Sequence, residues 1–121
     1  MLRLSPPLLE SARRILSGSP VRLGAKICGW GEGPLTGEVS AGMLVEMGVS
    51  LVEVGHAERR SLFGEDATVV ARKTSAVLKA GLTPLLCIGE DRPVEPDDAA
   101  RFCAEQVRSP WAPALVGNES R

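Results

Sequence analysis

The sequence is poor in the residues that mark most specialised sites. Its 121 residues include no tyrosine, two phenylalanines, two tryptophans and a single histidine. The three cysteines, Cys28, Cys87 and Cys103, are scattered and lack Cys-x-x-Cys spacing, so we expect reduced thiols rather than a disulfide or a metal site. The formal net charge of −1 argues against nucleic acid or an anionic membrane as a partner.

Long apolar runs are also absent. A membrane-spanning helix needs about 18 consecutive apolar residues, and the sequence has no such segment; its opening residues hold too short an apolar run for a signal peptide. Hydrophobic residues nevertheless make up 44% of the chain and charged residues 24%, which suits a soluble globular protein with a core of Leu, Val and Ala. We therefore expect a cytoplasmic protein that does not interact with membranes.

Helical and strand patterns alternate along the chain. Apolar residues at helical spacing predict helices at 5–17, 40–48, 66–80 and 99–108, and short apolar or β-branched runs predict strands at 21–25, 51–55 and 83–89. A helix follows each strand, and this order requires a parallel sheet with right-handed crossovers. The sequence thus predicts an α/β fold with three strands, in which no strand precedes the first helix.

Reactive groups in such folds gather in the loops after the carboxyl ends of the strands, here 26–37, 55–65 and 89–98. His56 is the first residue after the second predicted strand, and Glu58 follows two positions later. A histidine at this place can point into a cleft and act in catalysis, or it can cap a helix without any chemistry. Its position alone leaves both interpretations open.

Other polar segments have equally plain interpretations. The run Glu58-Arg59-Arg60 fits a solvated salt-bridge cluster at the start of a helix. The glycine-rich stretch 31–37 has no Lys or Ser at P-loop spacing, which disfavours phosphate binding by this loop. Cys87 lies on a predicted core strand, where a thiol usually packs rather than reacts.

Four segments follow one another in an order and spacing that characterise a known family. They are Leu-Gly-Ala at 23–25, Leu-Thr-Gly-Glu-Val-Ser at 35–40, Val-Gly-His-Ala-Glu-Arg-Arg at 54–60, and Ala-Gly-Leu-Thr-Pro-Leu-Leu-Cys-Ile-Gly-Glu at 80–90. Together with Phe-Gly-Glu at 63–65, they resemble the triosephosphate isomerase family, most clearly over 21–90. The resemblance implies a segment of a (β/α)8 TIM barrel, which takes about 250 residues when whole. Residues 1–121 would form one partial domain, from the second helix of the barrel through the fifth.

The resemblance also implies a reaction. The family interconverts dihydroxyacetone phosphate and glyceraldehyde 3-phosphate by moving a proton between adjacent carbons through an enediolate. His56 would be the electrophile, a neutral imidazole that polarises the substrate carbonyl, as is known for that family. Glu58 would hold the catalytic lysine, and Cys87 would pack beneath the site. The implied substrate is a small phosphorylated sugar, with no cofactor and no metal.

By the same resemblance, the complete protein would be a homodimer. Thr36, at the tip of the glycine-rich loop, would cross a two-fold interface and steady the site of the partner subunit. Glu38 and Arg59 would form charge pairs across that interface. This role makes the glycine-rich stretch a docking loop rather than a phosphate cradle.

The sequence departs from the family pattern in several places. Ala57 replaces the usual Ser, and Lys26-Ile27 replaces Gln-Asn. The Asn-x-Lys strand, the phosphate-binding glycines and the Ala-Tyr-Glu-Pro-Val-Trp lid with the general base are missing; Ser-Pro-Trp-Ala at 109–112 is a chance echo of that lid. We therefore expect the 121-residue segment to be inactive alone. Two alternatives stay open: a related isomerase of a larger sugar phosphate such as a tetrulose phosphate, and a non-catalytic truncated paralogue that acts by association.

Overall fold

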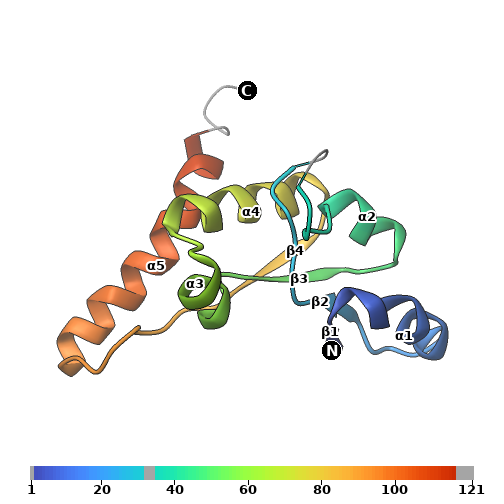
Figure 1. The fold of residues 1–121 in the computed structure, drawn as a ribbon, viewed down its shortest axis with the longest axis horizontal. Coiled ribbons are helices and arrows are strands. Elements are labelled where there is room, and N and C mark those ends of the chain that lie inside the picture. The colour runs from blue at the N-terminus through green and yellow to red at the C-terminus, as the bar shows by residue number, and fades with distance from the viewer. Residues whose placement is uncertain (1, 32–34, 117–121) are drawn as a thin grey trace.

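The computed structural model describes residues 2–31 and 35–116, with side chains described as far as residue 110. Its sheet contains four parallel strands in sequential order, β1 (Leu2–Leu4), β2 (Leu23–Ala25), β3 (Leu51–Val54) and β4 (Thr83–Leu86). The helices are the 3-10 turn η1 (Pro6–Leu8) and α1 (Leu9–Leu16), α2 (Ala41–Glu46), α3 (Ala57–Phe63), α4 (Ala67–Lys79) and α5 (Pro96–Val116) (Figure 1). The α/β fold with a parallel sheet, predicted from the alternating pattern, is confirmed.

The strand β1 corrects one expectation, because a strand does precede the first helix. Leu2 pairs with Leu23 and Leu4 with Ala25 in the parallel register that joins β1 to β2. Three residues are too few for an alternating pattern to stand out in a sequence, which is why this strand was missed. Because all four strands run parallel, their carboxyl ends lie at one edge of the sheet.

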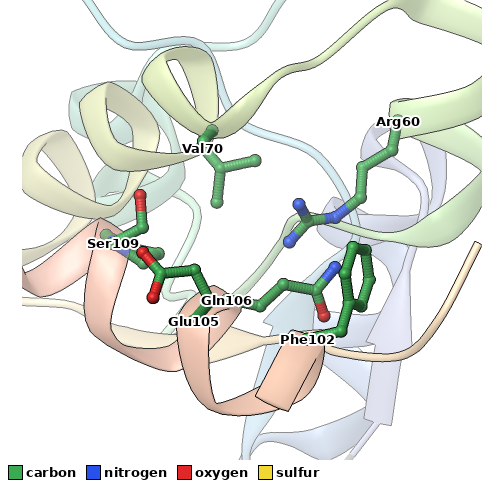
Figure 2. A pocket seen from close by; sticks show the side chains of 8 residues that line it. Arg60, Val70, Phe102, Glu105, Gln106 and Ser109 are labelled. Atoms are coloured by element: carbon green, nitrogen blue, oxygen red, sulfur yellow. The ribbon is translucent and has the colours of Figure 1, made fainter. Parts of the chain in front are cut away.

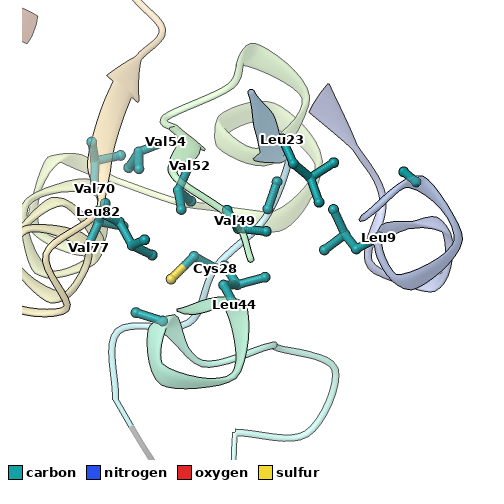
Figure 3. Packing of buried hydrophobic residues seen from close by; sticks show 13 residues of the cluster. Leu9, Leu23, Cys28, Leu44, Val49, Val52, Val54, Val70, Val77 and Leu82 are labelled. Carbon is teal, nitrogen blue, oxygen red and sulfur yellow. The ribbon is translucent and has the colours of Figure 1, made fainter. Parts of the chain in front are cut away.

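The hydrophobic core lies between one face of the sheet and helices α1, α2 and α4. Val52 and Val54 of β3 point toward Val70 and Val77 of α4 in this cluster, which also contains Leu44 of α2 (Figure 3). Successive side chains of a strand point to opposite faces. Leu51 and Glu53 therefore point to the other face of the sheet, away from the helices.

The structure adds one helix to those predicted and lengthens another. Residues 57–63, expected to be part of a loop, form α3, which ends where Gly64 adopts a left-handed conformation with φ of 64°. This helix is short and rich in charge, so it carries little helical periodicity. Helix α5 is longer than the predicted 99–108 and packs against α4 (Figure 1). Residues 109 and 110 of the lid-like segment belong to α5, while the side chains of 111 and 112 are outside the described part.

Two of the remaining helices begin with side-chain caps. Ser40 caps α2 by accepting from the backbone N–H of Met43, and Asp66 caps α4 by accepting from that of Val69. Both caps satisfy N–H groups that have no partner inside the helix. Among the helices of the described residues, none is long and apolar enough to cross a membrane.

Candidate active site

The site begins where β3 ends and the chain turns into α3. Gly55 makes this turn with φ of 73°, a left-handed conformation that favours glycine. A Cβ on Gly55 would also lie 2.6 Å from Nη2 of Arg60. The left-handed conformation thus favours glycine, and a Cβ would also require the Arg60 guanidinium to shift. The turn places His56 at the carboxyl edge of the sheet.

His56 takes one of the two roles that its position leaves open, the helix cap, and it also lies at a cavity. It is the N-cap of α3, and its Nδ1 accepts a hydrogen bond of 3.2 Å from the backbone N–H of Glu58. A nitrogen that accepts carries no proton, so the neutral tautomer has its proton on Nε2. The helix cap therefore sets up Nε2 as a hydrogen-bond donor, while the His56 side chain stays 42% exposed.

Arg60 ties the ends of two strands together. Its Nε donates to the carbonyl of Gly55 at 2.6 Å and its Nη2 to the carbonyl of Cys87 at 3.2 Å. Burial lowers the pKa of Arg60 from its ordinary value. Of the run at 58–60, only the Glu58 side chain is well exposed, at 78%. The run is therefore not a solvated cluster, since Arg60 holds the turn beneath His56 in place.

A cavity of about 270 Å³ lies between this turn and helices α4 and α5. It is lined by Arg60, Val70 and residues of α5 that include Phe102 and Gln106 (Figure 2). The Gln106 side-chain oxygen accepts a 2.8 Å hydrogen bond from the backbone N–H of Gly89. Gly89 follows β4, so Gln106 anchors α5 to the loop at the edge of the sheet that carries His56. Because its lining is largely apolar packing between helices, this cavity offers no chemistry of its own.

The cavity at the site itself has a volume of about 230 Å³ and is lined by His56, Glu53 and Cys87, among others. Sequence reasoning missed Glu53, which is 8% exposed on β3. Its Oε1 accepts from the Cys87 thiol at 3.3 Å, is 3.4 Å from Nη1 of Arg3, and is 3.9 Å from Nε2 of His56. The sequence does hold a signal for Glu53, because it is the one carboxylate within the apolar run of the strand at 51–54.

Cys87 acts here as a neutral donor. Burial, reinforced by the hydrogen bond to Glu53 and the Glu53 charge, raises the pKa of the Cys87 thiol to about 11. Burial likewise raises the pKa of Cys28 to about 11. A thiol of this pKa is a weak nucleophile near neutral pH, which fits a packing role for Cys87. Within the described part of the chain, no three His, Cys, Asp or Glu side chains converge as a metal site requires.

Two residues predicted for a subunit interface, Glu38 and Arg59, belong to a charge cluster within one chain. Nη2 of Arg59 is 2.7 Å from Oε1 of Glu38, and Nε of Arg59 donates to Glu65 at 2.9 Å. The buried Lys73 contacts both carboxylates. The sequence analysis expected Glu38 and Arg59 to form charge pairs across two subunits, whereas the structure pairs them with each other within one chain. Glu65 and Lys73, which complete the cluster, were not predicted.

Thr36 lies apart from His56, near this charge cluster. It is exposed and lines a cavity of about 350 Å³ together with Trp30, Arg59 and Phe63. The guanidinium of Arg59 stacks over the Phe63 ring at 4.3 Å from its centroid. Residues 32–34 of the predicted docking loop are outside the described part. The structure thus separates two groups, His56 with Glu58 at one place and Thr36, Glu38 and Arg59 at another.

Comparison with known proteins agrees with this geometry. The family profile described as triosephosphate isomerase matches residues 3–115. The triosephosphate isomerase of Azoarcus sp. (strain BH72) is 51% identical over 85 residues, which is 69% of this chain and 35% of that protein. The L-erythrulose-1-phosphate isomerase of Pectobacterium atrosepticum is 44% identical over 102 residues, 84% of this chain and 39% of that protein.

A solved structure supports the same assignment. The crystal structure of triosephosphate isomerase from Bartonella henselae superposes with a TM-score of 0.80 at 35% identity, covering 88% of this chain and 46% of that one. This match confirms the predicted (β/α)8 barrel segment, since that enzyme is the type example of the fold. The chain spans 35% of the Azoarcus relative. On its sequence, its fold and the placement of His56, the chain belongs to the triosephosphate isomerase family.

Proposed function

We propose that the complete protein is an aldose–ketose isomerase of the triose-phosphate type, with dihydroxyacetone phosphate and glyceraldehyde 3-phosphate as its first candidate substrates. The observation that carries this proposal is the hydrogen bond from the Glu58 backbone N–H to Nδ1 of His56. It sets the proton of a neutral imidazole on Nε2, beside a cavity at the carboxyl edge of a parallel sheet. Family membership supports the same reaction class.

The chemistry follows from that proton. Moving hydrogen between adjacent carbons passes through an enediolate, whose negative charge develops on the two neighbouring oxygens. A preorganised N–H donor in a partly enclosed site stabilises such charge without having to reorganise. His56 would donate from Nε2 to these oxygens. The substrate needs no cofactor for this step, because only protons move.

Glu58 would position a cation rather than touch the reacting carbons. Its side chain is 78% exposed at the first turn of α3, within reach of groups from elsewhere in the protein. An exposed carboxylate there can hold the ammonium of a catalytic lysine supplied by another strand. That lysine and the general base would come from parts of the complete protein beyond this segment, which spans about a third of its curated relatives.

We also infer a homodimer in which the charge cluster lies near the subunit contact. Oε2 of Glu38 is buried and has no hydrogen-bond partner among the described residues. Phe63 is 64% exposed beside the cavity that Thr36 lines. An exposed apolar ring is a feature that a partner surface can cover, and a two-fold contact would use the same patch twice.

One observation favours a second candidate substrate. The match to an L-erythrulose-1-phosphate isomerase extends over 84% of this chain, against 69% for the Azoarcus triosephosphate isomerase. A four-carbon ketose phosphate undergoes the same proton transfer. The reaction class is therefore common to both candidates, and the substrate length is the point to be tested.

The test is a coupled isomerase assay with the protein encoded by the full reading frame that contains these residues. We expect turnover of a triose or tetrulose phosphate, and background rates for the 121-residue segment assayed alone. The loss of a positioned base and of a cation each costs orders of magnitude. A full reading frame of only these residues, or a longer folded protein with no turnover of either substrate, would contradict the proposal and favour a non-catalytic paralogue.

A further inference from the structure

A buried carboxylate lies beside the proposed electrophile. The Glu53 side chain is only 6% exposed, yet it lines the same cavity as His56. Nη1 of Arg3 lies 3.4 Å from its Oε1, and the Cys87 thiol donates to that atom. Burying a carboxylate costs desolvation energy, so the position of Glu53 beside His56 points to a role in the site.

The two groups are close enough to contact neighbouring oxygens of one small sugar. Oε1 of Glu53 and Nε2 of His56 are 3.9 Å apart, too far for a direct hydrogen bond. Because the single proton on Nε2 serves the reacting oxygens, Glu53 must contact a different oxygen of the substrate. A carboxylate only accepts, so that oxygen must be a hydroxyl that donates to it.

The reaction decides which hydroxyl this is. The two oxygens on the reacting carbons both share the charge of the enediolate, and a carboxylate in contact with either would oppose that charge. Glu53 is therefore suited to a hydroxyl that keeps its proton throughout the reaction. A triose phosphate has none, because its third carbon carries the phosphate. A ketose phosphate of four carbons has one hydroxyl outside the reacting pair.

We propose that Glu53 determines specificity by accepting a hydrogen bond from a substrate hydroxyl that lies outside the reacting carbon pair. The inference rests on the proposed isomerase function and refines it: the preferred substrate is a sugar phosphate of at least four carbons. Arg3 is a positioning residue in this arrangement, since its guanidinium holds the Glu53 carboxylate and does not line the cavity.

The experiment measures kcat/KM of the complete protein on a triose phosphate and on a tetrulose phosphate. Glu53→Gln keeps the shape of the side chain and removes its charge. A hydrogen bond to a charged group is worth about 1.5–3 kcal/mol, so the tetrulose-to-triose ratio of kcat/KM should fall roughly 10- to 100-fold. Glu46→Gln, at an exposed glutamate of α2, should leave the ratio unchanged and serves as the matched control.

A double variant guards against misfolding. Arg3→Leu with Glu53→Leu removes both charges of the pair, a change that is often neutral for stability, and the same fall in ratio is expected. An unchanged ratio in either folded variant, an equal loss on both substrates, or a wild type that turns over only trioses would overturn the inference. A wild type inactive on both substrates would instead contradict the isomerase proposal itself.

Discussion

The backbone N–H of Glu58 and Nδ1 of His56 share a 3.2 Å hydrogen bond that serves the fold and the proposed chemistry at once. The bond caps α3, and it exists only while Nδ1 carries a lone pair. An imidazolium, with protons on both nitrogens, would lose the cap. The start of this helix therefore places the proton of a neutral imidazole on Nε2, the atom that would donate in the proposed reaction.

Removing the His56 imidazole should separate these two roles. In the complete protein we expect His56→Gln to lower kcat at least about 100-fold with little change in KM, because the donor acts mainly on the developing oxyanion. His56→Asn is the control for capping, since asparagine is a favoured N-cap and should keep the unfolding free energy near that of wild type. Full turnover in both variants would exclude the electrophile role.

The turn at Gly55 yields a stability prediction with an internal control. Gly55→Ala places a Cβ 2.6 Å from Nη2 of Arg60 in a left-handed conformation, whereas Gly64→Ala meets the same backbone penalty with nothing within 4 Å. The left-handed conformation costs roughly 1 kcal/mol for alanine. Gly64→Ala should therefore cost about that much, and Gly55→Ala distinctly more. Urea unfolding of both variants measures the difference, and equal losses would show that Arg60 yields without cost.

The sequence predicted those parts of the site that depend on local order. His56 could be found because it directly follows a strand, and the helices at 40–48 and 66–80 because apolar residues recur there at helical spacing. Strand β1 and helix α3 were not predicted, since the strand is three residues long and the helix is rich in charge. For short elements of this kind, pairing and capping outweigh local propensity.

The missed site residue has a different cause. Glu53 owes its environment to Arg3, from β1 two strands away in the sheet, and to Cys87, the residue that follows β4. In the same way, Lys73 joins Glu38 only because the fold brings residues 35 positions apart into contact. No local pattern encodes such contacts. A charged residue within an apolar strand is the one sequence sign that a partner must exist, and it does not identify the partner.

The buried thiols predict how stability depends on pH. Burial raises the pKa of Cys28 from 9.0 to about 11 in the folded chain. Between these pH values the unfolded chain has lost the thiol proton while the folded chain retains it, so the unfolding free energy must fall as pH rises. Below about pH 9 both states are protonated and the thiol adds no slope. Unfolding titrations from pH 8 to 11 should show a shallower decline for Cys28→Ala; identical slopes would contradict the burial effect.

The proposed dimer can be tested at Thr36, which is exposed at the rim of the cavity lined by Phe63 and Arg59. In the complete protein, Thr36→Arg would bring bulk and a positive charge against the Arg59 side of this surface. We expect monomers in light scattering, with reduced activity if the loop steadies the partner's site. The predicted loss arises from association, so the thermal unfolding of the isolated 121-residue segment should change little.

A matched substitution outside this surface separates association from general damage. Ser11 is exposed on α1 and contributes to neither the His56 cavity nor the one lined by Thr36. Ser11→Arg adds the same side chain, and it should leave both the dimer and the activity intact. If Thr36→Arg behaved like this control, the docking role would be wrong. A wild type that is monomeric would lead to the same conclusion, and Lys26-Ile27, where this chain departs from the family, would then be the first positions to restore to Gln-Asn.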